Sequence, residues 1–197
     1  MGFRYYQFLI GLLATASLSY ANPILFTFQG IGSGSVGAVG FTNASFTLTQ
    51  SSDTSLITSF SNGFALTYET PPASGASIAI AGFGSGILST VTDVADVQQS
   101  PSSFVALAIA STGGDVAGRG TTFDTYNLES AVGPIITPSQ FVSNFTVAST
   151  LGGVSFTSIS NLTFTATTVP EPSTIPLLGA GLLLELALSR RPRSRCH

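Results

Sequence analysis

The sequence predicts an all-β protein, built as a single β-sandwich or jelly-roll-like domain. Three observations support this: apolar residues alternate with polar ones along several segments, Gly-Ser and Pro clusters separate these segments, and no stretch keeps a period of 3.6 residues. Alternation buries one face of a strand and leaves the other in water. We expect eight to ten short strands with turns between them, as in a sandwich.

Each alternating segment assigns one set of residues to the core. In chain order the predicted inward sets are Ile24, Phe26 and Phe28; Phe46 and Leu48; Phe64, Leu66 and Tyr68; Phe141, Phe145 and Val147; Leu162 and Phe164. Residues 105–110 are continuously apolar, which predicts a central strand covered on both faces. At residues 93–99 we expect one helical turn at most. The predicted breaks are residues 30–37, 71–72, 113–114, 134–138 and 152–153.

The composition of the central region restricts its partners. The chain has 197 residues, of which 8% are charged, and it has neither Lys nor Trp. Residues 22–169 contain one basic residue, Arg119, and seven acidic residues, which gives a net charge of −6. The acidic residues are Asp53, Glu69, Asp93, Asp96, Asp115, Asp124 and Glu129. This balance disfavours nucleic-acid binding, since such binding needs basic side chains against the phosphates. About 148 residues suffice for a core without disulfides.

Residues 1–21 have the three parts of a secretory signal peptide. Arg4 gives a short positive region, residues 8–18 are apolar, and Ser19-Tyr20-Ala21 places small residues at the −3 and −1 positions of a cleavage site. We therefore expect cleavage between Ala21 and Asn22. The alternative is a membrane anchor, but the apolar run is shorter than the roughly 20 residues that a span needs, and Pro23 follows it.

Residues 169–197 form a second terminal signal. The segment Pro170-Glu171-Pro172 precedes an apolar stretch at residues 175–188, which predicts a short transmembrane helix. A basic stop-transfer cluster follows: Arg190, Arg191, Arg193 and Arg195. Positive residues stay on the cytoplasmic side, so this order leaves residues 22–168 outside. The helix is short for a span and contains Glu185, which suits a temporary anchor.

This tail resembles the PEP-CTERM sorting signal, in which a Pro-Glu-Pro motif, an apolar helix and an Arg cluster end the chain. The resemblance covers about 27 residues. It implies processing by an exosortase, a membrane transpeptidase-like enzyme of Gram-negative bacteria that produce exopolysaccharide. In that reading Pro170, Glu171 and Pro172 are recognised by the processing enzyme. Glu185 and Pro192 depart from the usual pattern. The alternative is a chance Pro-Glu-Pro linker before an ordinary tail anchor.

The remaining motifs do not assemble an enzyme. Residues 32–37 read GSGSVG and fit the spacing of a dinucleotide loop, but the helix that such a loop needs is not predicted, so we expect a hairpin connection. The single histidine and the single cysteine, His197 and Cys196, end the chain. Without Lys, a G-x-S-x-G elbow or a base in the central region, nucleophilic hydrolysis is disfavoured. We expect no cofactor and no metal.

Several residues are candidates for binding. Asp93, Asp96 and Asp115 offer oxygen ligands for Ca²⁺, and they and Asp124 and Glu129 are the acids of a hypothetical glycosidase. Arg119 is expected to pair with Asp115 or Asp124. Tyr68, Tyr126 and the Phe residues are candidates for a sugar-stacking platform, although Phe at alternating positions is more often core. Asn43, Asn144 and Asn161 each begin an N-x-S/T glycan acceptor pattern, which we interpret as chance in a Ser/Thr-rich chain.

The sequence thus predicts a signal peptide (1–21), a Ser/Thr/Gly-rich β-domain (22–168) and a sorting tail (169–197). We expect a non-enzymatic structural protein of the cell surface or extracellular matrix, associated with exopolysaccharide or biofilm. It is expected to reach the cell surface through an inner-membrane intermediate. The alternatives are a carbohydrate-binding adhesin, with Ca²⁺ as a candidate assisting ion, and, third, a hydrolase that uses carboxylates.

Overall fold

The computed structural model describes residues 22–61, 65–71, 76–88, 95–100, 103–109 and 114–169. Within these ranges the chain forms antiparallel strands and two short 3-10 helices, which confirms the all-β prediction. The predicted signal peptide and the predicted sorting tail from Pro170 onward lie outside the described residues. No helix in the described ranges is long and apolar enough to cross a membrane.

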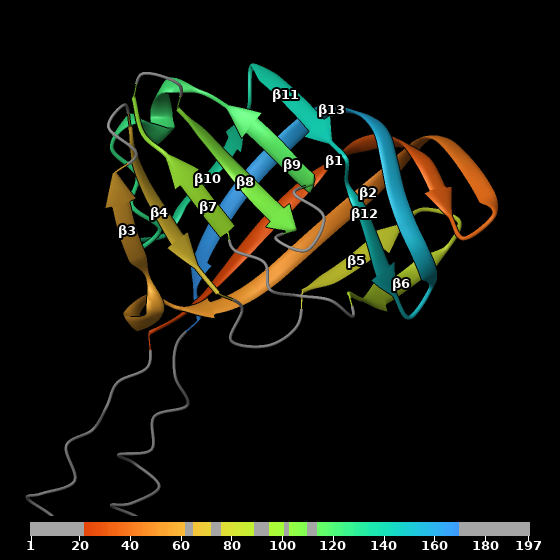
Figure 1. Cartoon of the computed structure of the whole chain (residues 1–197), viewed down its shortest axis with the longest axis horizontal. Coiled ribbons are helices and arrows are strands. Elements are labelled where there is room, and N and C mark those ends of the chain that lie inside the picture. The colour runs from red at the N-terminus through yellow and green to blue at the C-terminus, as the bar shows by residue number, and fades with distance from the viewer. Residues whose placement is uncertain are drawn as a thin grey trace, which may run out of the picture.

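The strands form two sheets (Figure 1). Sheet A has the order β10-β13-β1-β2-β5-β6, with β12 also paired to β13, and sheet B has the order β11-β9-β8-β7-β4-β3. The strand bounds are β1 Pro23–Val36, β2 Val39–Asp53, β3 Thr58–Ser61, β4 Leu66–Thr70, β5 Ser77–Ile80, β6 Gly84–Ile87, β7 Ala95–Gln98, β8 Phe104–Ile109, β9 Gly114–Arg119, β10 Val132–Ile136, β11 Ser139–Ser143, β12 Thr146–Ser149 and β13 Gly152–Thr168. The 3-10 helices are η1 Thr54–Leu56 and η2 Thr121–Asp124.

Three long strands organise the molecule. β1, β2 and β13 have 14, 15 and 17 residues, whereas the others are short. One half of these strands packs against sheet B as a sandwich, and the other half curls round with β5, β6 and β12 (Figure 1). An isolated bridge between Leu88 and Ser149, with a 2.9 Å hydrogen bond from Thr150 N to Ile87 O, joins the β6 side to the β12 side. Sheet A therefore closes almost into a ring at this end.

β-Bulges let the long strands bend. The β1–β13 register shifts between Gln29 and Ile31, opposite Asn161, and the β1–β2 register shifts between Gly32 and Gly34, opposite Asn43. Both asparagines have positive φ, 52° for Asn161 and 51° for Asn43, a conformation that Asn tolerates better than most residues. A bulge increases the local twist and bend of a strand. The bulges thus turn β1, β2 and β13 from the sandwich into the ring.

Two aromatic clusters fill the core, and β13 supplies the centre of each. In the sandwich half, the ring of Phe164 contacts four others, those of Phe26, Phe28, Phe123 and Tyr126, with centroid distances of 5.1–6.2 Å. In the other half, where sheet A closes almost into a ring, the aromatic ring of Phe156 contacts those of Phe41, Phe46 and Phe145, with centroid distances of 4.7–5.7 Å. Offset and edge-to-face aromatic pairs add to the stabilisation from apolar burial.

Glycine allows the second cluster to sit against β1. A Cβ on Gly32 would lie 2.7 Å from Cε1 of Phe156, and a Cβ on Gly34 would collide with the carbonyl oxygen of Ser155. Residues 32–36 therefore belong to β1, and the turn is confined to Gly37-Ala38. The prediction of a break over residues 30–37 was wrong, because here Gly serves close packing rather than flexibility.

Other predicted breaks and one predicted turn also need correction. Gly152 and Gly153 begin β13, and Pro134 lies inside β10, which is an edge strand where proline is tolerated. The single helical turn predicted at residues 93–99 was wrong for Ala95–Gln98, which form β7. Ala95 and Val97 are buried, and Asp96 and Gln98 are less so, a period of two. Asp93 lies outside the described residues.

The predicted inward sets are confirmed in most strands. Ile24, Phe26, Phe28, Phe46, Leu48, Phe145, Val147, Leu162 and Phe164 are all buried. Phe141 was assigned wrongly: Val142 packs against the core instead, since Asn144 at φ 44° separates β11 from β12 and changes the parity. In β4, Tyr68 packs on the core as predicted, whereas Leu66, of the same predicted set, is 36% exposed and Thr67, on the opposite face, is buried. Phe64 lies outside the described residues.

The central strand was predicted correctly. β8 lies in the interior of sheet B, with Val105 and Leu107 in the core and Ala106 buried on the opposite face.

The two ends of the domain lie together, because Val169 N donates to Pro23 O at 2.9 Å. At the same end, Thr54 N donates to Asn22 O at 3.1 Å. The segments before residue 22 and after residue 169 are therefore attached at the same end of the domain.

Candidate functional site

The outer face of sheet B carries three of the charged residues that the sequence singled out, Asp96, Asp115 and Arg119. Residues paired across antiparallel strands share a face. The register places one row across the sheet in the order Thr58, Glu69, Asp96, Ala106, Ala117 and Phe141, and a second row in the order Phe60, Thr67, Gln98, Phe104, Arg119 and Ser139. Val97, Val105 and Val116 point the other way, into the core.

Two carboxylates stand directly opposite each other in the first row. Glu69 on β4 pairs with Asp96 on β7, and Asp115 on β9 pairs with Ala108 on the intervening strand β8. Atom Oδ1 of Asp96 is buried and has no hydrogen-bond partner among the described residues. Burial, and to a smaller degree the carboxylates of Asp115 and Glu69, raises the pKa of Asp96 to about 7. Burial also raises the pKa of Asp115. Glu69 had not been grouped with Asp96, since the pairing appears only once the register is known.

The second part of this face is aromatic. The guanidinium of Arg119 lies 5.3 Å from the centre of the Phe141 ring, and the Phe104 ring meets Phe141 edge-on at 6.2 Å. The former is a cation–π contact. Phe60, on the edge strand β3, is 47% exposed. Among the described residues no ion pair joins Arg119 to Asp115 or Asp124, so the predicted pairing was wrong. The Asp124 carboxylate accepts from the hydroxyl of Ser103 instead.

The predicted tyrosine platform does not lie on an open surface. Tyr126 is 6% exposed, and its hydroxyl donates to Ser130 O at 2.9 Å. Burial raises the pKa of Tyr126. Tyr68 points from β4 into the core. Among the described aromatic residues of this face, Phe60 is exposed and Phe104 and Phe141 are half-buried.

The carboxylates proposed for Ca²⁺ are dispersed in the part of the chain that the structure describes. There, no three His, Cys, Asp or Glu side chains come close enough to hold a metal ion. Asp96 and Asp115 lie on strands separated by β8, Asp93 is outside the described ranges, and Glu129 accepts from Asn127 Nδ2 at 2.7 Å in a local loop.

Residues 32–37 do not form a dinucleotide loop. The strand β1 runs to Val36 and turns at Gly37-Ala38 directly into β2. Such a loop requires a helix whose N-terminus faces the pyrophosphate, and a strand follows here. The prediction that this is a hairpin connection holds for the turn itself.

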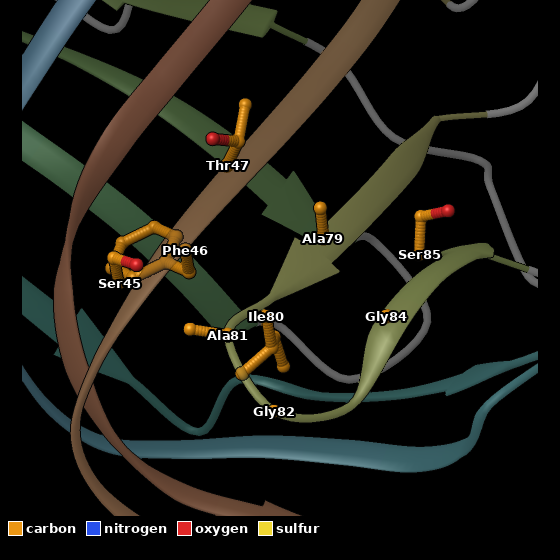
Figure 2. Close-up of a pocket in the computed structure, with 9 residues that line it drawn as sticks. All are labelled: Ser45, Phe46, Thr47, Ala79, Ile80, Ala81, Gly82, Gly84 and Ser85. Carbon is orange, nitrogen blue, oxygen red and sulfur yellow. The ribbon is translucent and has the colours of Figure 1, made fainter.

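A shallow hollow lies beside the β5–β6 hairpin (Figure 2). It is lined by Ser45, Phe46, Thr47, Ala79, Ile80, Ala81, Gly82, Gly84 and Ser85. Its polar groups are three hydroxyls and the backbone, and no lining side chain titrates near neutral pH. This hollow offers hydrogen bonds but no acid–base group.

The three N-x-S/T asparagines share one conformation. Asn43, Asn144 and Asn161 are exposed and have φ values of 44–52°. Two of them form the bulges described above, and the third separates β11 from β12. Their positions are explained by the backbone geometry that Asn tolerates.

The remaining predicted residues belong to the terminal signals. Ala21, the Pro-Glu-Pro motif (Pro170, Glu171, Pro172) and the arginines (Arg190, Arg191, Arg193, Arg195) lie outside the described residues. Asn22 begins the described domain, and its backbone N donates to Asp53 Oδ1 at 3.4 Å.

Comparison with known proteins identifies the tail. Residues 168–191 match the PEP-CTERM protein-sorting motif. This motif implies an exported protein that an exosortase sorts through the membrane to the cell surface. Neither the comparison with curated proteins nor that with solved structures gave a match. The chain thus carries a PEP-CTERM sorting motif, and its described residues form a two-sheet, all-β domain.

Proposed function

We propose that this protein is a non-enzymatic structural component of the extracellular matrix, associated with exopolysaccharide or biofilm and delivered by its sorting motif. The observation that carries the proposal is the match of residues 168–191 to that motif. The exported part is then the β-domain, whose described surface must supply the function.

The outer face of sheet A supports a structural role. The strand register places Thr165, Thr27, Thr49 and Ser77 in one row across four strands, and Thr163, Gln29 and Thr47 lie in the next row. The hydroxyls of Thr49 and Ser77 are hydrogen-bonded to each other at 2.5 Å. An uncharged hydroxyl face stays hydrated and does not repel a polysaccharide of either charge. This suits a protein embedded in a carbohydrate matrix.

The positions of the domain ends support the sorting route. Pro23 and Val169 are joined by a backbone hydrogen bond, so the predicted signal peptide and the sorting tail both connect at one end of the domain. Cleavage at Ala21-Asn22 and near Pro170-Glu171-Pro172 would free the domain without cutting through the described core, whose buried residues lie between Ile24 and Ala166.

Intact-mass measurement of the protein isolated from its native cell surface tests this route. We expect a chain that begins at Asn22 and has lost the arginine cluster. Replacement of Pro170, Glu171 and Pro172 by Ala should leave the tail attached, whereas Ser173→Ala should be processed normally. A full-length chain in the cytosol at steady state, with both ends uncut, would refute the proposal.

A second candidate function, carbohydrate binding, is favoured by one observation. On the outer face of sheet B, Phe104 and Phe141 lie beside Arg119, and Phe60 lies toward the opposite edge of the sheet, on the strand paired with that of Glu69. Aromatic faces stack on the apolar faces of sugar rings, and charged groups bond their hydroxyls. A glycan array probed with residues 22–169, with and without Ca²⁺, tests it. Binding that Phe141→Ala abolishes and Phe83→Ala keeps would support this function, and silence in both conditions would exclude it.

A further inference from the structure

We infer that the contact between β4 and β7 depends on a proton: protonated Asp96 holds the β3–β4 pair on sheet B, and deprotonation loosens that pair. The inference rests on the Glu69–Asp96 pairing and on the buried, unpartnered Oδ1 of Asp96. It goes beyond the proposed function and does not depend on it.

The groups that face Asp96 do not compensate a negative charge. From β4 it faces Glu69, from β8 it faces Ala106, and the acid on β9 is Asp115. Arg119, the basic residue of this face, lies in the neighbouring row over the Phe141 ring. Like charges directly opposite each other in an antiparallel pair are destabilising, and a charge without a partner is costly to bury.

The contact between β4 and β7 is short enough for one pair to matter. The two strands pair only over Thr67–Gln98, Tyr68–Val97, Glu69–Asp96 and Thr70–Ala95, extended by a 2.9 Å hydrogen bond from Gln99 N to Leu66 O. β3 is joined to sheet B through β4. On the far side, Thr70 is held by Gln50, whose Nε2 donates to Thr70 O at 3.2 Å. The like-charged pair thus lies inside the one ladder that attaches the edge of the sheet.

The direction of the pH dependence follows from the pKa of Asp96. Burial, Asp115 and Glu69 raise it from 3.8 to about 7, so the folded protein keeps a proton that the unfolded chain releases near pH 4. The contribution of Asp96 to the free energy of unfolding is highest below about pH 4, declines as the pH rises to about 7, and levels off above that. A comparison of pH 5 with pH 8 therefore covers most of the change.

Hydrogen exchange of residues 22–169 at these two pH values, corrected for intrinsic exchange rates, provides the test. Between pH 5 and pH 8 the rise of the Asp96 pKa from 3.8 to about 7 sets a ceiling near a hundredfold, and the partial exposure of Asp96 reduces it. We expect protection of β3, β4 and β7 to fall at least tenfold from pH 5 to pH 8, while β1 and β13 change less than threefold.

Asp96→Asn removes the charge at nearly constant shape. We expect this variant to lose the pH-dependent fall and to be better protected than the wild type at pH 8. Glu129→Gln, a change at an exposed carboxylate outside the sheet, should behave like the wild type. Glu69→Gln, which serves if Asp96→Asn does not fold, should shift the fall to lower pH.

Three results would overturn the inference. They are equal protection of β3 and β4 at both pH values, an unchanged fall in Asp96→Asn, and a fall of the same size in β1 and β13, which would place the effect on the whole domain rather than on this contact.

Discussion

At the scale of single residues, glycine decides how closely the long strands approach. Gly32 and Gly34 lie in β1 where Phe156 and the Ser155 backbone occupy the space of a side chain. Sequence reasoning interpreted these glycines as a break, because a Gly-Ser run is typical of loops. The contacts that require glycine involve residues more than 100 positions away, and spacing along the chain does not reveal them.

Gly34→Ala tests this role of glycine. The added methyl group would collide with the carbonyl of Ser155, so we expect the free energy of unfolding to fall by about 2 kcal/mol or more. The matched control is Gly153→Ala, where the new Cβ meets nothing within 4 Å and a change within about ±1 kcal/mol is expected. Denaturant unfolding followed by circular dichroism measures both. Equal effects of the two substitutions would contradict the packing role.

At the scale of elements, alternation predicted the strands well and failed where the backbone changes parity. Phe26, Phe28, Leu162 and Phe164 were placed correctly because their strand segments are regular there. Phe141 was misplaced because Asn144 interrupts the strand. A bulge adds one residue to one strand only, so it shifts every later side chain to the other face. A single sequence marks such a position only by a residue that tolerates positive φ.

The same limit applied to the candidate site. Asp96, Asp115 and Arg119 were recognised as chemically notable, but which carboxylate faces Asp96 depends on the pairing of β4 with β7. That pairing joins segments separated by about 25 residues, with no local signal for their register. Tyr126 was proposed as accessible and is in the core, since its hydroxyl finds a backbone partner inside the fold.

Substitutions at Asn161 test the role of the bulges. Asn161→Gly keeps a residue that accepts φ 52° and should change the free energy of unfolding by less than about 0.5 kcal/mol. Asn161→Val places a β-branched side chain in a disfavoured conformation and should cost about 1–3 kcal/mol. Thr163→Val, on the same strand without positive φ, controls for the new side chain. Thermal unfolding distinguishes them, and a fully tolerated Asn161→Val would show that the bulge does not fix this position.

At the scale of the whole molecule, the adjacent ends and the long strands define one unit. β13 pairs with β1, β10 and β12, and so connects the sandwich half to the ring half. The terminal signals were interpreted from their order along the sequence, and the comparison confirmed the tail at residues 168–191. Such signals are read as linear segments, which is why sequence alone sufficed there.

A circular permutant tests the unity of the domain. Joining Val169 to Asn22 by a short Gly-Ser linker, and opening the chain between Gly37 and Ala38, should give a protein that unfolds in one transition like the parent, since the old ends are bonded neighbours and the new ones lie in a turn. Opening the chain instead after Thr27, inside β1, should prevent folding. Circular dichroism and calorimetry report both outcomes. A permutant opened at Gly37 that stays unfolded would show that the two ends of the domain cannot be joined by a linker without loss of folding.

The hydrogen bond between Val169 and Pro23 also has a mechanical consequence. β1 and β13 leave this point as antiparallel neighbours, so traction between the two ends would open their ladder one bond at a time, as a zipper opens, and at low force. Traction between Val169 and the Gly37 turn would instead load the whole ladder in shear, with many bonds resisting together. The force that the domain withstands therefore depends on whether its surroundings are attached at the end that holds Pro23 and Val169 or at the Gly37 turn.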